Sequence, residues 1–137
     1  MARKPSAWVY SPARAPKQKV PEALKKDVEA RASQFVTDVL RPKHLKPAPK
    51  DTDFNYLVDI STKWYRHYFY FCATYCSPSP HAIAPSFETK FARLEYLGEQ
   101  KFQLSYMRHT EQWFALYIGL SIEECFAAIS DQPHFFP

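Results

Sequence analysis

Glycine is nearly absent from this sequence, which has two glycines among 137 residues. The P-loop and the dinucleotide-binding fingerprint both need closely spaced glycines to approach phosphates, and Gly98 and Gly119 are too far apart for either motif. The Gly-x-Ser-x-Gly elbow and the His-Glu-x-x-His zinc motif are also missing. These absences argue against nucleotide-dependent enzymes and the common hydrolases, and we expect no cofactor.

Long apolar runs are missing as well. No stretch approaches the roughly 18 apolar residues of a membrane helix, and the start Met-Ala-Arg-Lys-Pro-Ser lacks the apolar part of a secretory signal. Cysteine is scarce, and its odd count of three does not suit a disulfide framework. We therefore expect a cytoplasmic protein with reduced thiols and no contact with membranes.

Three of the residues that could bind a metal ion are close together in the sequence, namely Cys72, Cys76 and His81. Structural zinc sites usually pair cysteines two residues apart, whereas positions i and i+4 of a strand are roughly 13 Å apart. The spacing favours cysteines that pack as small apolar residues. We expect no metal site.

Positive charge is concentrated in the N-terminal part of the chain. Residues 1–50 contain twelve Lys and Arg against four Asp and Glu, so the rest of the chain is acidic despite the overall charge of +4. Residues 1–20 mix proline, alanine and basic residues without periodicity. We interpret residues 1–20 as a flexible basic arm and residues 21–137 as a single α+β domain.

Two segments have the apolar spacing of amphipathic helices. The first begins at Pro21, shows apolar residues at helical intervals and is expected to end near Leu40 or Arg41, before Pro42. The second begins at Ser121, which stands in capping-box spacing with Glu124, and is expected to end near Ser130.

Between the helices the sequence predicts about five strands joined by short connections, which favours an antiparallel meander. The expected strands are Phe54–Ser61, Lys63–Tyr75, Phe87–Leu97, Lys101–Arg108 and Gln112–Ile118. A proline-rich loop over 77–86 and turns at 97–100 and 109–111 connect the later strands. The fold class is therefore α+β, with an N-terminal helix, a meander sheet and a short C-terminal helix.

The segment from Lys63 to Cys76 has seven aromatic residues among its fourteen positions. Read as one strand, it presents rings on both faces, with Trp64, Tyr68 and Tyr70 on one of them. If the helices cover one face, the rings on the other face form a surface of the kind that marks interaction sites. We therefore expect a protein that acts by binding, either as a homodimer or with another protein partner.

Nucleic acid is a further possible partner, through the basic arm and the aromatic strand. Single-stranded nucleic acids stack their bases on rings and place their phosphates near cations. The candidate binding residues are Trp64, Tyr65, Arg66, Tyr68 and Tyr70.

An alternative function is that of a small metal-independent ribonuclease or toxin-like nuclease. Such an enzyme needs a base, an acid and a cation, which two Arg-His dipeptides could supply. The candidate catalytic residues are His67, His109, Arg66 and Arg108. Neighbouring residues of a strand point to opposite faces, so this interpretation allows only one member of each pair in a common cleft.

The C-terminal part of the chain resembles a known family. The segments Lys90–Tyr96, Trp113–Tyr117 and Asp131–Phe136 are similar in layout to a family of small bacterial proteins of unknown function, some of them plasmid-related. The resemblance covers roughly the last 50 residues of the chain, which lacks that family's polar Trp-His strand after the Leu-Tyr strand. It implies a bacterial, intracellular protein and assigns no activity or site residues.

Overall fold

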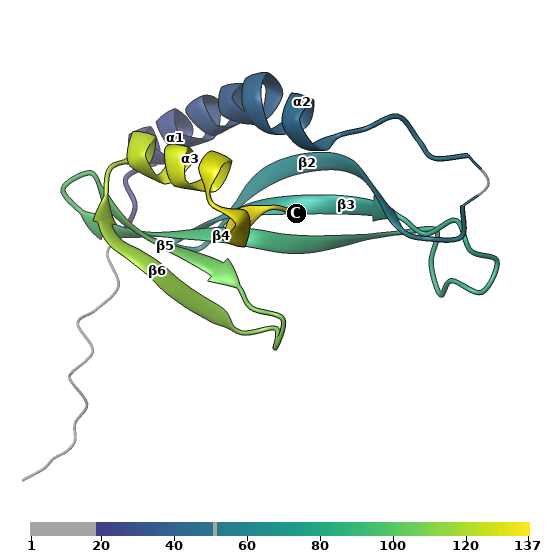
Figure 1. Cartoon of the computed structure of the whole chain (residues 1–137). Coiled ribbons are helices and arrows are strands. Elements are labelled where there is room, and N and C mark those ends of the chain that lie inside the picture. The colour runs from purple at the N-terminus through teal and green to yellow at the C-terminus, as the bar shows by residue number, and fades with distance from the viewer. Residues whose placement is uncertain (1–18, 51) are drawn as a thin grey trace, which may run out of the picture.

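Helices lie on one face of a five-stranded antiparallel sheet in the computed structural model, which describes residues 19–50 and 52–137 (Figure 1). The strands are β2 (Tyr56–Tyr65), β3 (Tyr68–Cys76), β4 (Ser86–Gly98), β5 (Lys101–Met107) and β6 (Trp113–Leu120). The helical segments are α1 (Glu22–Phe35), a π-helical turn (Val36–Leu40), α2 (Arg41–His44), α3 (Ile122–Asp131) and a 3₁₀ turn (Pro133–Phe135).

The strands pair in sequence order, β2-β3-β4-β5-β6, and every pair is antiparallel. This confirms the predicted α+β fold with a five-stranded meander between an N-terminal and a C-terminal helix. The turn at Glu99 and Gln100 is also confirmed, and both residues have positive φ angles, of 54° and 62°. Most of the arm predicted for residues 1–20 lies outside the described residues.

The division of the aromatic segment into strands was predicted wrongly. We expected one strand over Lys63–Tyr75, but the chain reverses at Arg66 and His67, and Tyr65 pairs with Tyr68. Arg66 has a φ of 57°, in the left-handed region that usually selects Gly, Asn or Asp. Because none of those residues marks the turn, the continuous run of rings concealed it.

The first helical segment also extends further than expected. It passes through Pro42 to His44, because the π-helical turn lets the backbone N–H of Arg41 donate to the carbonyl of Val36, five residues earlier. Pro42 then falls in the first turn of α2, where a missing N–H is tolerated. The predicted helix end at residue 40 or 41 is therefore wrong by one turn.

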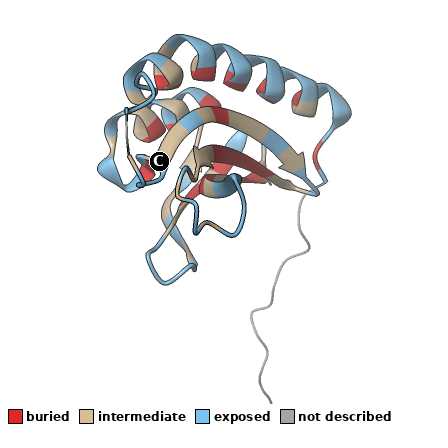
Figure 2. Cartoon of the chain, turned by 90° about the vertical axis from the view of Figure 1, so that its right-hand side faces the viewer, coloured by how far each residue is buried: buried red, intermediate tan, exposed pale blue. Residues whose placement is uncertain are grey.

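The hydrophobic core fills the space between the helices and the sheet. Phe69 and Phe71 of β3 are fully buried there, and buried residues line the sheet-facing side of α1, as Figure 2 shows. The helical segments contribute Leu24, Val28, Ala32, Val36, Leu40, Ile122, Cys125, Ile129 and Phe135 to the core. Burial of this apolar surface is the main force that holds the helices on the sheet.

The C-terminal helix begins as the sequence predicts. The Ser121 hydroxyl accepts a hydrogen bond from the Glu124 backbone N–H, and the Glu124 carboxylate accepts one from the Ser121 N–H, which completes the capping box. The chain then returns toward β5, where Phe135 is fully buried and its ring lies 6.1 Å from that of Tyr106.

Candidate functional site

The sheet face opposite the helices carries a second group of rings. Alternate residues of β3 point to opposite faces, so Tyr68 and Tyr70 lie on the side away from Phe69 and Phe71. Their neighbours in register on the same side include Tyr65 of β2. We call this side the open face; the residues used below to describe it are Lys63, Tyr65, Arg66, His67, Tyr68, Tyr70, Glu88, Lys90, Arg93 and Trp113.

Arg93 lies at the centre of the open face. Its guanidinium carbon is 4.4 Å from the centroid of the Tyr68 ring and 4.9 Å from that of Trp113, so one cation contacts rings from two strands that are far apart in sequence. Its Nε atom is buried without a hydrogen-bond partner, and no ion pair joins Arg93 to a carboxylate within residues 19–50 and 52–137. A half-buried cation of this kind favours an external anion, because burial without a countercharge costs free energy.

Tyr70 forms the floor of this cluster. The residue is only 9% exposed, its ring centroid lies 5.8 Å from that of Trp113, and the ammonium group of Lys90 lies 5.6 Å from the Tyr70 centroid. A ligand on the open face would therefore contact the residues around Tyr70 more than Tyr70 itself, which supports their rings from the sheet.

The β2–β3 turn extends the cluster to one end of the sheet. Tyr65 is 56% exposed, the guanidinium of Arg66 lies 5.2 Å from its ring, and the ring of His67 lies 4.2 Å from that of Tyr68. Because both turn residues stack on rings of the open face, the expectation that Arg66 and His67 point to opposite faces is wrong. It assumed a strand where the structure has a turn.

Trp64 takes the other side of the sheet. Its indole Nε1 donates a hydrogen bond of 3.1 Å to the carbonyl of Lys25 in α1, and its ring lies 4.9 Å from that of Phe69. The predicted grouping of Trp64 with Tyr68 and Tyr70 on one face is therefore wrong, since the turn changes which residues share a face. Of the candidate binding residues, Tyr65, Arg66, Tyr68 and Tyr70 come together on the open face.

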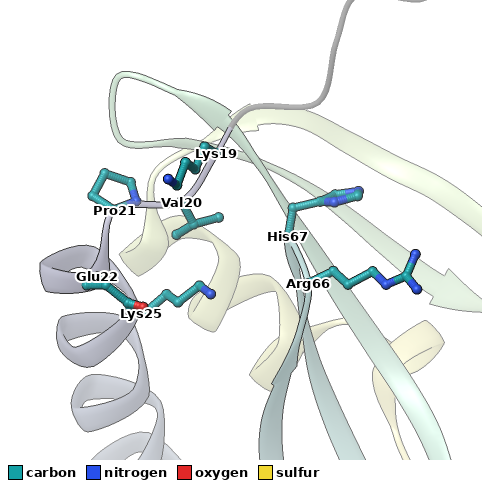
Figure 3. Close-up of a pocket in the computed structure, with 7 residues that line it drawn as sticks. All are labelled: Lys19, Val20, Pro21, Glu22, Lys25, Arg66 and His67. Carbon is teal, nitrogen blue, oxygen red and sulfur yellow. The ribbon is translucent and has the colours of Figure 1, made fainter.

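A basic pocket of about 630 Å³ adjoins the turn (Figure 3). It is lined by Lys19, Val20, Pro21, Glu22, Lys25, Arg66 and His67. Figure 3 shows the Lys25 side chain pointing toward the strands, while Arg66 and His67 extend away from α1. The cationic groups therefore do not converge on one point, and the pocket forms a basic border that leads onto the open face.

The second Arg-His pair lies elsewhere. Arg108 and His109 lie in the β5–β6 turn, with the Arg108 guanidinium 5.2 Å from the Phe114 ring. Tyr68 pairs with Glu95 of β4, and Glu95 pairs with Gln103 of β5. Gln103 precedes Arg108 by five positions, which corresponds to roughly 17 Å along a strand. The two pairs therefore do not share a cleft, and the nuclease alternative stays a prediction.

Other polar groups of this face are paired or inert. The Lys63 ammonium contacts the Glu88 carboxylate at 2.7 Å, and this hydrogen bond holds the pKa of Glu88 below its usual range. Burial raises the pKa of Cys72 to about 11, so its thiol is protonated at neutral pH. Among the residues that the structure describes, no group of three or more His, Cys, Asp or Glu could hold a metal ion.

Sequence reasoning did not select Lys90, Arg93 or Trp113 as site residues. They lie on β4 and β6, and the strand register brings them beside Tyr68 and Tyr70. The sequence does not reveal which strands pair with β4 and β6, nor the bulge after Phe71. Without that knowledge, the alternation of side chains along each strand does not show that these three residues share a face.

The fold and this cluster define an α+β protein in which the helices of residues 19–50 and 52–137 all lie on the other face of the sheet. The model of a family described as a domain of unknown function (DUF3024) matches residues 20–137, and the chain belongs to this family. No curated protein and no solved structure matches the chain. Among the described residues, no helix has the length and apolar character needed to cross a membrane.

Proposed function

We propose that this protein acts by binding rather than by catalysis, and that its open face binds single-stranded nucleic acid. The observation that supports this proposal is the half-buried guanidinium of Arg93, which lies between two aromatic rings without an acidic partner in residues 19–50 and 52–137. Proteins that bind single strands combine cations for the phosphates with rings on which bases stack. Arg93, Tyr68 and Trp113 provide both at one place.

The charge of the open face favours an anionic ligand over a second copy of this face. The face carries two acidic residues, Glu88, which is paired with Lys63, and Glu95, which is opposite Tyr68 in the register. Three further cations, Arg66, Lys90 and Arg93, have no ion pair within the described part of the chain, so positive charge exceeds negative charge on this face. A two-fold dimer through this face would bring the same patch of both copies together, and like charges would then oppose each other. Each of these cations would instead strengthen the binding of a polyanion.

The basic pocket extends this surface beyond the rings. Lys19 and Lys25 add positive charge beside Arg66, so the backbone of a bound strand would pass from the stacked bases toward the start of α1. The basic arm predicted for residues 1–20 would add further cations to the same path.

The test is a titration of a fluorescently labelled single-stranded oligonucleotide, followed by anisotropy at about 50 mM salt, where phosphate contacts are strong. We expect Arg93→Gln to weaken binding roughly tenfold or more, because a hydrogen bond to a charged group contributes about 1.5–3 kcal/mol. Arg31→Gln is the matched control, since Arg31 is an exposed arginine of α1 that pairs with Asp27 and Glu123. Absence of binding by the native protein, or equal binding by both variants, would refute the proposal.

We also propose the setting that the C-terminal resemblance implies, a bacterial, plasmid-related and cytoplasmic protein. The support is the resemblance of the segments between residues 90 and 136, together with three cysteines that form no disulfide. Fractionation of a cell that carries the gene, followed by blotting, tests the cytoplasmic location.

A further inference from the structure

Glu95 and Gln103 also belong to the open face, on the side away from the helices in Figure 1. On β4, the buried core residue Leu94 precedes Glu95, so the Glu95 side chain points away from the helices. On β5, Gln103 stands between the buried core residues Phe102 and Leu104 and points to the same side. The register then aligns side chains from β2 to β6 in one row, here called the first row, namely Tyr65, Tyr68, Glu95, Gln103 and Ile118.

The first row has apolar ends and a polar centre. Tyr65 and Tyr68 supply rings at one end, and Ile118, which is 72% exposed, supplies an apolar surface at the other. Between them stand the carboxylate of Glu95 and the amide of the half-buried Gln103. Within the part of the chain that the structure describes, no hydrogen bond involves that amide. A nucleic acid base has apolar faces and a polar edge, so this order of side chains suits a base that stacks on a ring and turns its edge toward Gln103.

A second row of the open face lies beside the first and carries the central cation. It consists of Lys63, Tyr70, Arg93, Ser105 and Ala115. Along β3, β4 and β5 the two rows are separated by two residues, roughly 7 Å. In a nucleotide the sugar separates the base from the phosphate, so a base over the first row leaves its phosphate near Arg93. One row therefore suits the bases of a bound strand, and the other suits its backbone.

We propose that Gln103 selects bases that carry an exocyclic amino group beside a ring nitrogen, namely adenine and cytosine, over thymine and uracil. This inference rests on the proposed function, because it names the class of base that the same face takes. A side-chain amide has both an acceptor and donors. The Gln103 oxygen can therefore accept from the amino group while the Gln103 nitrogen donates to the ring nitrogen, as in the bidentate contact of glutamine with adenine.

Glu95 supplies the reason for rejecting thymine and uracil. An amide alone also pairs with the N–H and carbonyl of those bases, so Gln103 by itself does not discriminate. Glu95 is the direct neighbour of Gln103 in the register, and its carboxylate oxygens only accept hydrogen bonds. Because Glu95 is only 9% exposed, solvent screens its charge weakly. A base carbonyl would face this carboxylate and be repelled, whereas the second N–H of an amino group would donate to it.

The experiment is an anisotropy titration of the full chain with labelled oligo(dA), oligo(dC) and oligo(dT) of equal length, at about 50 mM salt. We expect the native protein to bind oligo(dA) and oligo(dC) roughly tenfold more tightly than oligo(dT), the order of discrimination that one bidentate contact to a base provides. The comparison of oligo(dC) with oligo(dT) is the more stringent one, because both are pyrimidines and differ mainly in the polar edge.

Two variants separate the reading of bases from the binding of phosphates. Gln103→Leu should weaken the binding of oligo(dA) and oligo(dC) to the level of oligo(dT), whose own binding should stay close to native. Arg93→Gln should instead weaken all three by a similar factor, as expected for a phosphate contact. Gln34→Leu is the matched control and should keep the native preference, since Gln34 is an exposed residue of α1 that bonds to Asp38.

The possible failures are distinguishable. Equal affinity of the native protein for the three oligonucleotides would overturn this inference and leave the proposed function standing. A folded Gln103→Leu protein that keeps the native preference would also overturn it, because another residue would then read the base. Absence of binding to all three would refute the proposed function and this inference together. If circular dichroism shows that Gln103→Leu does not fold, Gln103→Ala takes its place with the same expected result.

Discussion

The two faces of β3 use aromatic residues for different purposes. On the helix side, Phe69 and Phe71 are fully buried among other apolar side chains, and their rings lie 5.6 Å apart. On the open face, Tyr68 and Tyr70 are interleaved with cations, with Arg93 over one ring and Lys90 near the other. The comparison shows that aromatic content alone does not separate a core from a site, and that the neighbouring side chains do.

The difference has a physical reason. Rings packed against aliphatic side chains stabilise the fold in proportion to the apolar area that they remove from water. Rings packed against guanidinium and ammonium groups hold those cations at the surface, and the cations attract anions, which the core rings do not. Substitutions on the two faces should therefore change different measurements.

The largest expected effect is on the helix side. Phe71→Ala should lower the free energy of unfolding by about 3–5 kcal/mol, because it removes a fully buried ring from between the sheet and the helices. Urea unfolding followed by circular dichroism measures the loss. Phe54→Ala is the control, since Phe54 is 83% exposed. A loss below about 1 kcal/mol for Phe71→Ala would contradict the assignment of this face as the core.

An intermediate effect is expected on the open face. Tyr65→Ala should weaken binding of a single-stranded oligonucleotide by about 1–3 kcal/mol, the usual contribution of one stacked base. It should leave the unfolding midpoint close to that of the native protein, since the ring is more than half exposed. Anisotropy and urea unfolding on the same sample measure both quantities, again with Phe54→Ala as control. Unchanged binding would remove Tyr65 from the site.

The smallest expected effect concerns the ion pair of the open face. Because Lys63 holds the pKa of Glu88 below its usual range, the pair contributes stability above the unfolded pKa of about 4.3, and this stability is lost as the pH falls through the lower folded pKa. Both side chains are partly exposed, so the contribution should stay below about 1 kcal/mol. Urea unfolding between pH 7 and pH 3 should show a shallower acid loss for Lys63→Met than for the native protein. An identical acid loss would mean that the pair does not form in solution.

Much of the fold could be predicted because its signals are local. Pro21, the Ser121–Glu124 capping box and the turn at Gly98 mark element boundaries within a few residues of themselves, and the structure has each of them. Two element boundaries were predicted wrongly, for different reasons. At Arg66, a residue type that rarely has a positive φ forms a turn, and at Pro42 the helical segment accommodates a proline. Both are local backbone arrangements that the usual residue preferences do not indicate.

The candidate site could be predicted only in part. Tyr65, Arg66, Tyr68 and Tyr70 are neighbours in sequence, so a dense aromatic segment identified them directly. Trp113 is more than forty positions away from Tyr70, yet their rings lie 5.8 Å apart. Periodicity does not encode that contact, which depends on the order and register of strands β3 to β6.

The sequence by itself determined the class of fold and the number of strands, because helix caps, turns and apolar periodicity act over a few residues. Only the tertiary structure decided which rings face the helices and which face Arg93. Those outcomes depend on a two-residue turn at Arg66 and His67 and on strand register, and a shift of one residue would exchange the faces.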